Sequence, residues 1–86
     1  MASYELKIKP SAAKELEGIG SKKDRQRIVA RISSLAVDPR PPGCQKLSGS
    51  EKYRVRQGVY RILYTVDDEI VTVVVIRIAH RRDVYR

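Results

Sequence analysis

The sequence predicts a single α+β domain in which two helices cover one face of a single β-sheet. Three observations lead to this prediction. The chain has 86 residues, enough for one domain with one modest hydrophobic core. Helical periodicity is confined to residues 11–36, whereas strand-like alternation precedes that segment and resumes after residue 52. The expected order over residues 1–86 is an N-terminal strand, a helical hairpin and a three-stranded antiparallel meander.

The first strand is predicted at residues 4–9, where apolar and charged side chains alternate. This strand would be half buried, and its inward side chains would be Tyr4, Leu6 and Ile8. The following Pro10 changes the structure, and Ser11 is a suitable N-cap for a short helix. Glycines at positions 18 and 20 are expected to end this helix.

A second helix is predicted to begin after Ser21. The Ser-x-x-Asp spacing of Ser21 and Asp24 lets each side chain bond the other's backbone N–H. Apolar residues then recur at helical spacing, with basic residues mainly on the opposite side. The apolar positions are Ile28, Val29, Ile32, Leu35 and Ala36. Asp38-Pro39 and residues 40–43 should stop the helix and form a stiff loop.

The meander is predicted to begin at residues 53–57, which alternate with period two. This alternation puts Arg54 and Arg56 on the same face. Gly58 breaks or bulges the chain before a strand over residues 60–66. The sheet face away from the helices, or part of it, would then carry Arg54, Arg56 and Arg61.

The last hairpin is predicted to turn at residues 67–69, which are all acidic. Residues 70–76 are almost continuously β-branched and apolar. That pattern is typical of a strand buried on both faces, so this strand is expected to be central in the sheet.

Charge and cysteine usage restrict the partners and the compartment. The formal net charge is +8, from 18 Lys and Arg against 10 Asp and Glu, which favours binding to polyanions. No apolar run is long enough to span a bilayer, and charged residues interrupt the N-terminus where a signal peptide would lie. The single cysteine, Cys44, excludes an internal disulfide, so we expect a cytoplasmic protein without membrane contact.

The chemistry-bearing residues suit RNA cleavage better than other reactions. One histidine and one cysteine provide no metal-ligand cluster, and no nucleophile has an evident partner base. No glycine-rich phosphate loop is present. In RNA the ribose 2′-OH is itself a nucleophile, so the protein needs only cations for the phosphate and groups that move protons. An aromatic ring can stack on a splayed base.

Several segments together resemble the RelE/ParE toxin superfamily. They are Lys46-Leu47-x-Gly49, the Tyr53-to-Tyr64 block, the β-branched strand and His80-Arg81-Arg82-Asp83-Val84-Tyr85. The order of elements matches that superfamily from end to end, which implies a RelE-like, microbial-RNase-like domain. Because the positions of Arg61, Arg81 and Tyr85 are filled, the chain is more similar to RelE-type messenger-RNA interferases than to ParE-type gyrase poisons.

The resemblance implies the toxin of a type II toxin–antitoxin system. RelE-type toxins are metal-independent endoribonucleases, need no cofactor and cut messenger RNA in the ribosomal A site. They leave a cyclic or 3′-phosphate and a 5′-hydroxyl, and a cognate antitoxin silences them. The implied partners are the ribosome, messenger RNA and a RelB-like antitoxin, through which a hetero-oligomer could bind operator DNA.

The resemblance also implies roles for individual residues. Arg61 would stabilise the transition state, Arg81 would act near the leaving oxygen, and Tyr85 would stack on or orient the nucleotide. Either Arg81 or Arg82 could be the catalytic arginine. The residues expected to bind RNA or the ribosome are Lys46, Lys52, Arg54, Arg56 and Arg82.

Two of these positions depart from the family pattern. Arg54 and Arg56 stand where well-known relatives carry lysines, one of them a candidate general base. Arginine is a poor proton acceptor. Another group must therefore accept the proton, or charge stabilisation dominates. His80 is the preferred substitute and Tyr85 the second.

Other functions fit part of the same pattern. The domain could be a ParE-like gyrase inhibitor without catalysis, or a non-toxic basic nucleic-acid-binding module. Arg54 and Arg56 could also simply protect a solvated strand edge from aggregation.

Overall fold

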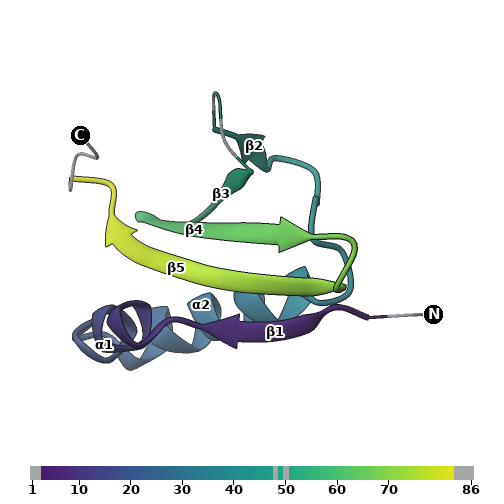
Figure 1. The fold of residues 1–86 in the computed structure, drawn as a ribbon. Coiled ribbons are helices and arrows are strands. Elements are labelled where there is room, and N and C mark those ends of the chain that lie inside the picture. The colour runs from purple at the N-terminus through teal and green to yellow at the C-terminus, as the bar shows by residue number, and fades with distance from the viewer. Residues whose placement is uncertain (1–2, 48, 50, 83–86) are drawn as a thin grey trace.

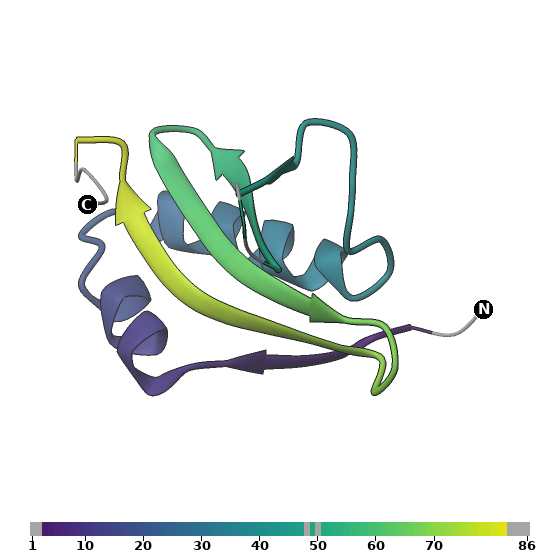
Figure 2. The same ribbon diagram turned by 45° about the horizontal axis from the view of Figure 1, so that its top comes forward.

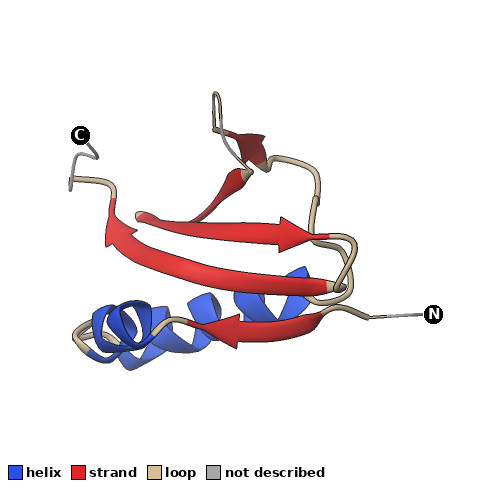
Figure 3. Cartoon of the chain, in the orientation of Figure 1, coloured by secondary structure: helices blue, strands red, loops and turns tan. Residues whose placement is uncertain are grey.

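The computed structural model describes residues 3–47, 49 and 51–82. In this part of the chain, two helices pack against a five-stranded mixed sheet, which confirms the predicted α+β class (Figures 1 and 3). The elements are β1 (Glu5–Ile8), α1 (Pro10–Glu17), α2 (Lys22–Leu35), β2 (Gln45–Lys46), β3 (Lys52–Gln57), β4 (Tyr60–Asp67) and β5 (Thr72–His80). The strand order is β1-β5-β4-β3-β2, with β1 parallel to β5 and the other pairs antiparallel. The short β2 was not predicted, because two residues carry no readable alternation.

The hydrophobic core lies between the helices and one face of the sheet (Figure 2). From α2 come the buried residues Ile28, Ile32 and Leu35, as predicted. The Oγ of Ser21 accepts a hydrogen bond from Asp24 N at 3.2 Å, which confirms the predicted N-cap. Val29, which shares the apolar spacing of α2, is 47% exposed and does not belong to the core.

The N-terminal predictions need two corrections. The first helix starts at Pro10, with Lys9 rather than Ser11 at the N-cap position. Proline suits the first helical position because its φ is already helical and the missing N–H would have no partner there. Ile8 was expected in the core but is 39% exposed. The reason is that β1 is an edge strand, in which Leu6 packs against the core, as does Tyr4 just before the strand.

The β4–β5 turn is longer than predicted. Asp67 Oδ1 accepts hydrogen bonds from the backbone N–H groups of Glu69 and Ile70, at 3.0 and 3.2 Å. These bonds extend the turn, so that β5 begins at Thr72 and Ile70 is left 66% exposed. Val71 adopts a φ of 51°, a left-handed conformation that is uncommon for a β-branched residue.

A β-bulge interrupts β5. Its pairing with β4 passes from Val75 to Arg77 and leaves Ile76 without an opposite residue. Before the bulge Val75 faces the core, and after it Ile78 does, with exposures of 0% and 3%. β5 has a neighbour on each side, but the prediction that both its faces are buried was wrong, since Val74 on the other face is half-buried.

A polar network ties the loop after α2 to the β4–β5 turn. Arg40 forms a two-bond ion pair with Asp68, at 3.1 and 2.8 Å, and donates to Tyr53 Oη at 3.1 Å. Tyr4 Oη donates to Asp68 at 2.7 Å, and Tyr64 Oη donates to a loop carbonyl. The hydrogen bonds from Arg40 and then Tyr4 lower the pKa of the Asp68 carboxyl.

None of the helices formed by the described residues is long and apolar enough to span a bilayer.

Candidate phosphate-binding site

Arginines from three strands gather on the sheet face that turns away from the helices, called here the outer face. Residues directly opposite each other in neighbouring strands share a face. Arg56 lies opposite Arg61, and Arg61 lies opposite Ala79. The next row along the strands holds Arg54, Leu63 and Arg77. The alternation of β3 and β4 therefore places Arg54, Arg56 and Arg61 together, as the sequence indicated.

Three arginines line a small hollow at one end of this face, called here the arginine hollow. It has a volume of about 100 Å³. Its lining residues are Arg56, Gly58, Val59, Tyr60, Arg61 and Arg81. No carboxylate is among them. Arg61 Nε is buried and has no hydrogen-bond partner among the described residues. Among the described residues, the hollow is therefore lined by positive charge and by no acidic side chain.

The β3–β4 turn builds the hollow. Gly58 has a φ of 60° and occupies the first position of a two-residue turn, an arrangement typical of type II′ hairpins. The second turn residue, Val59, accepts a hydrogen bond from Arg81 N at 2.7 Å. This bond joins the segment after β5 to the turn, and Figure 2 shows the two side by side. Arg81 thereby reaches Arg56 and Arg61, although 20 positions separate it from Arg61 in the sequence.

The other residues predicted to bind RNA lie outside the arginine hollow, on different parts of the sheet and its turns. Lys52 and Arg54 are on the outer face, and the Arg54 guanidinium donates to the Gln45 side chain of β2. Lys46 lies opposite Tyr53, which puts it on the other face of the sheet. Arg82 is exposed in the turn after β5. Tyr85 lies outside the described residues.

His80 is not in the arginine hollow. Because the bulge shifts the alternation, His80 shares the helix-facing side with Tyr60, whose ring lies 5.5 Å from the imidazole in an edge-on contact. There it lines a separate hollow with Glu15 of α1. His80 Nδ1 also accepts a hydrogen bond from Arg82 N at 3.1 Å. A neutral imidazole that accepts at Nδ1 carries its proton on Nε2, so neither nitrogen is placed to take a proton from a ligand in the arginine hollow.

This arrangement can bind a phosphate and stabilise added negative charge on it. Guanidinium groups match the geometry of phosphate oxygens and stay charged at any ordinary pH. Within the described residues, no group of three or more His, Cys, Asp or Glu side chains could hold a metal ion.

Two site features were missed by sequence reasoning. Arg77 reaches the outer face only because of the bulge, which leaves no signal in the sequence. The Gly58-Val59 turn was read as a break or bulge, although a glycine between two alternating segments could have indicated a tight hairpin.

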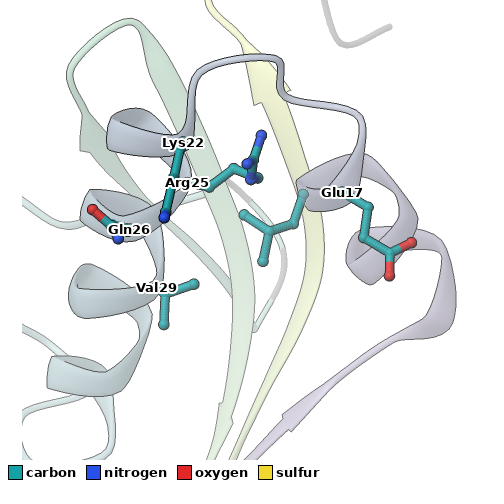
Figure 4. A pocket seen from close by; sticks show the side chains of 6 residues that line it. Glu17, Lys22, Arg25, Gln26 and Val29 are labelled. Carbon is teal, nitrogen blue, oxygen red and sulfur yellow. The ribbon is translucent and has the colours of Figure 1, made fainter.

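A larger groove lies between α1 and α2, away from the arginine hollow. Its volume is about 640 Å³, and Leu16 and Val29 form its apolar floor. Its rim is polar, with Glu17 from α1 and with residues of α2 (Figure 4). The α2 rim consists of Lys22, Arg25 and Gln26. An apolar floor with a charged rim is suited to a partner protein.

Comparisons with known proteins agree with one another. The chain matches the family described as ParE toxin of type II toxin-antitoxin system, parDE, over residues 6–85. Toxin RelG of Mycobacterium tuberculosis (strain ATCC 25618 / H37Rv) is 48% identical over 42 residues, which are 49% of this chain and 46% of RelG. The matched segment thus spans about half the length of that relative.

Solved structures extend the similarity to nearly the whole fold. The archaeal RelE–RelB complex from Pyrococcus horikoshii OT3 superposes with a TM-score of 0.83 at 25% identity, covering 95% of this chain and 99% of that chain. The isolated E. coli RelE toxin has a TM-score of 0.77 at 30% identity, covering 91% and 84%. The RelE-like fold implied by the sequence is confirmed.

Proposed function

The chain belongs to the RelE/ParE superfamily of toxins from type II toxin–antitoxin systems, and from this premise we propose that it cleaves messenger RNA on the ribosome. The observation that carries the proposal is the convergence of Arg56, Arg61 and Arg81 on one hollow, where the part of the chain that the structure describes contributes no carboxylate. An RNA phosphate would occupy that hollow. A small domain of this kind would depend on the ribosome to position the substrate and to supply part of the catalytic surface.

In the proposed reaction the ribose 2′-oxygen attacks the adjacent phosphorus, and the bond from phosphorus to the 5′-oxygen breaks. The products are a 2′,3′-cyclic phosphate, which water can open to a 3′-phosphate, and a 5′-hydroxyl. Arg61 and Arg56 would neutralise the charge that grows on the phosphate oxygens. Arg81 would act near the leaving 5′-oxygen, which gains a proton as the 2′-oxygen loses one.

Charge stabilisation would contribute more to this reaction than proton removal by a side chain. Arg56 is a poor base, and His80 faces the other side of the sheet with Nδ1 occupied. We assign His80 a positioning role instead: its bond to Arg82 N orders the turn that carries Arg81. The 2′-OH proton would then pass to water or to a ribosomal group, with the Tyr85 phenol as a further acceptor.

Cleavage of messenger RNA in programmed ribosomes tests this function. Arg61→Ala and Arg81→Ala should each lower the cleavage rate by at least about 100-fold, as loss of a transition-state donor does in other enzymes. The matched control is Arg27→Ala, which removes an exposed arginine from α2 on the other side of the sheet. If the Arg61→Ala variant cleaves messenger RNA as fast as the Arg27→Ala control, the proposed site is refuted.

We further propose that a RelB-like antitoxin neutralises the toxin, and that the complex binds operator DNA through the antitoxin. Support comes from the P. horikoshii relative, which was solved as a RelE–RelB complex.

The groove between α1 and α2 would receive an amphipathic antitoxin segment on Leu16 and Val29. Val29→Glu should weaken antitoxin binding at least about tenfold by placing a charge on the apolar floor, and should leave messenger-RNA cleavage unchanged. Unchanged antitoxin binding would exclude this groove.

Inhibition of DNA gyrase without catalysis is the second candidate function, because the matching family is described by ParE toxins. Induction in a bacterial host separates the two candidates. Transcripts cut within translated codons support the ribonuclease, whereas gyrase-dependent DNA breaks with intact transcripts support the inhibitor.

A further inference from the structure

Arg77 of β5 is a cation of the outer face that has no role in the proposed reaction. It lies opposite Leu63 of β4, which lies opposite Arg54 of β3. We propose that Arg77 and Arg54 form a second phosphate-binding position, which holds the phosphate next to the scissile one on single-stranded RNA. This inference rests on the proposed function, since it assumes that the scissile phosphate lies in the arginine hollow.

The bulge at Ile76 is what brings Arg77 to the outer face. Val73 and Val75 are fully buried on the helix side, so uninterrupted alternation would place residue 77 there too. A bulge disrupts the ladder locally, and bulges commonly re-aim a side chain near a functional site. Here the re-aimed side chain is a long cation in the row next to Arg61.

Glu15 of α1 holds Arg77 in place. Glu15 Oε2 lies 3.5 Å from Arg77 Nε, and Glu15 Oε1 accepts a hydrogen bond from Ile78 N at 2.9 Å. The pairing of β1 with β5 ends at Val75, so the backbone N–H of Ile78 is open to Glu15 of α1. The hydrogen bond from this N–H fixes the position of the Glu15 carboxylate. The Arg77 side chain remains 44% exposed, so it is both positioned and accessible to a ligand.

The spacing of the two rows suits consecutive phosphates. Arg54 and Arg77 stand two strands apart, roughly 10 Å, and their row is about 6.8 Å along β4 from the row of Arg61. That step is comparable with the backbone between neighbouring phosphates of an extended strand. Leu63 is only 8% exposed although it faces outward, as expected where the aliphatic stems of two arginines flank it. The paired residues of the two rows include no acidic side chain, and the carboxylate that contacts Arg77 is that of Glu15 from α1.

The test measures binding of a short fluorescent single-stranded RNA with 2′-O-methyl riboses, which cannot be cut, over a series of salt concentrations. Arg77→Met keeps much of the stem over Leu63 and removes the charge. It should weaken binding roughly threefold to fivefold at low salt and reduce the slope of log affinity against log salt by about 0.7, the value for one phosphate contact on a single strand. Arg27→Ala removes the same charge from α2 and should change neither quantity.

Equal affinity and slope for Arg77→Met and Arg27→Ala would overturn the inference, provided that thermal unfolding shows both variants folded. Arg77→Gln serves as a second variant if the Met variant does not fold. The two proposals fail separately. If Arg61→Ala abolishes ribosomal cleavage while Arg77→Met binds like the control, the function stands and the second position does not. If the wild-type protein cuts no messenger RNA but Arg77→Met loses one phosphate contact, Arg77 binds an RNA phosphate, whereas the proposed cleavage and the scissile phosphate in the arginine hollow are both refuted.

Discussion

His80 contacts the backbone of the segment that carries Arg81, and it lies on the opposite face of the sheet from Arg56 and Arg61. Its imidazole accepts the backbone N–H of Arg82 and contacts Tyr60 on the helix side, while the arginines that would bind phosphate lie on the outer face. The structure therefore separates the group best suited to proton transfer from the groups best suited to charge stabilisation. The proposed reaction depends on the second kind of group.

Substitution of His80 tests this separation. Asparagine can offer a carbonyl oxygen close to the place of Nδ1, so His80→Asn should keep ribosomal cleavage within about threefold, whereas His80→Ala should lose roughly tenfold with the bond to Arg82 N. The pH–rate profile of pre-bound complexes should have no ascending limb in the imidazole range. If His80→Asn is as inactive as Arg61→Ala, His80 is the base after all.

The hairpin between β3 and β4 determines the shape of the arginine hollow. Its turn has two residues, a glycine in the left-handed region followed by Val59, whose carbonyl holds the backbone of Arg81. A change in the turn should therefore affect the arginines of all three segments together, even though it removes no charge.

Gly58→Ala tests the role of this turn. A Cβ at Gly58 meets no atom within 4 Å, so its cost is the strain of a left-handed φ, about 1–2 kcal/mol in the free energy of unfolding. Ribosomal cleavage should fall more than stability alone explains, because the hollow changes shape. Gly20→Ala is the control, since that site also has open space and no left-handed φ. Equal activity of the two variants would contradict the link between turn and hollow.

Most of the helices and strands could be predicted from the sequence, and the predictions that were wrong or missing have physical causes. The apolar spacing in α2 and the alternation of β3 and β4 fixed which side chains face the core and which arginines face outward. The bulge at Ile76 could not be read, because the β-branched run through residues 70–76 satisfies either face. The faces of the sheet on which Arg77 and His80 lie could therefore be assigned only from the strand pairing in the structure. The approach of Arg81 to the hollow depends on a backbone bond, which sequence patterns do not encode.

At the scale of the whole molecule, the network around Arg40 joins parts of the chain that are far apart in sequence. Asp68 in the β4–β5 turn bonds Arg40 of the loop after α2 and Tyr4 before β1. The basic outer face has its arginines on β3, β4 and β5, so this network on the opposite end of β4 stabilises the sheet without entering the site.

The network predicts a loss of stability in acid. The Asp68 pKa is lowered in the folded state, so its contribution is fully present above the ordinary carboxyl pKa of about 3.9 and is lost as the pH falls through the folded value. Urea unfolding between pH 7 and pH 3 should therefore show a smaller acid loss for Asp68→Asn than for the wild type. Glu69→Gln, in the same turn, is the control. An equal acid loss in Asp68→Asn and wild type would contradict this role.

The central claim is that fixed arginine charges let a ribose attack its own neighbouring phosphate. The most direct measurement is cleavage of a ribosome-bound messenger RNA that carries a single 2′-deoxy sugar at the scissile nucleotide. We predict that this substrate is bound as tightly as the all-ribose RNA and is not cut at that position, while the all-ribose RNA yields a cyclic or 3′-phosphate and a 5′-hydroxyl. Normal cutting of the deoxy-substituted RNA would contradict the mechanism.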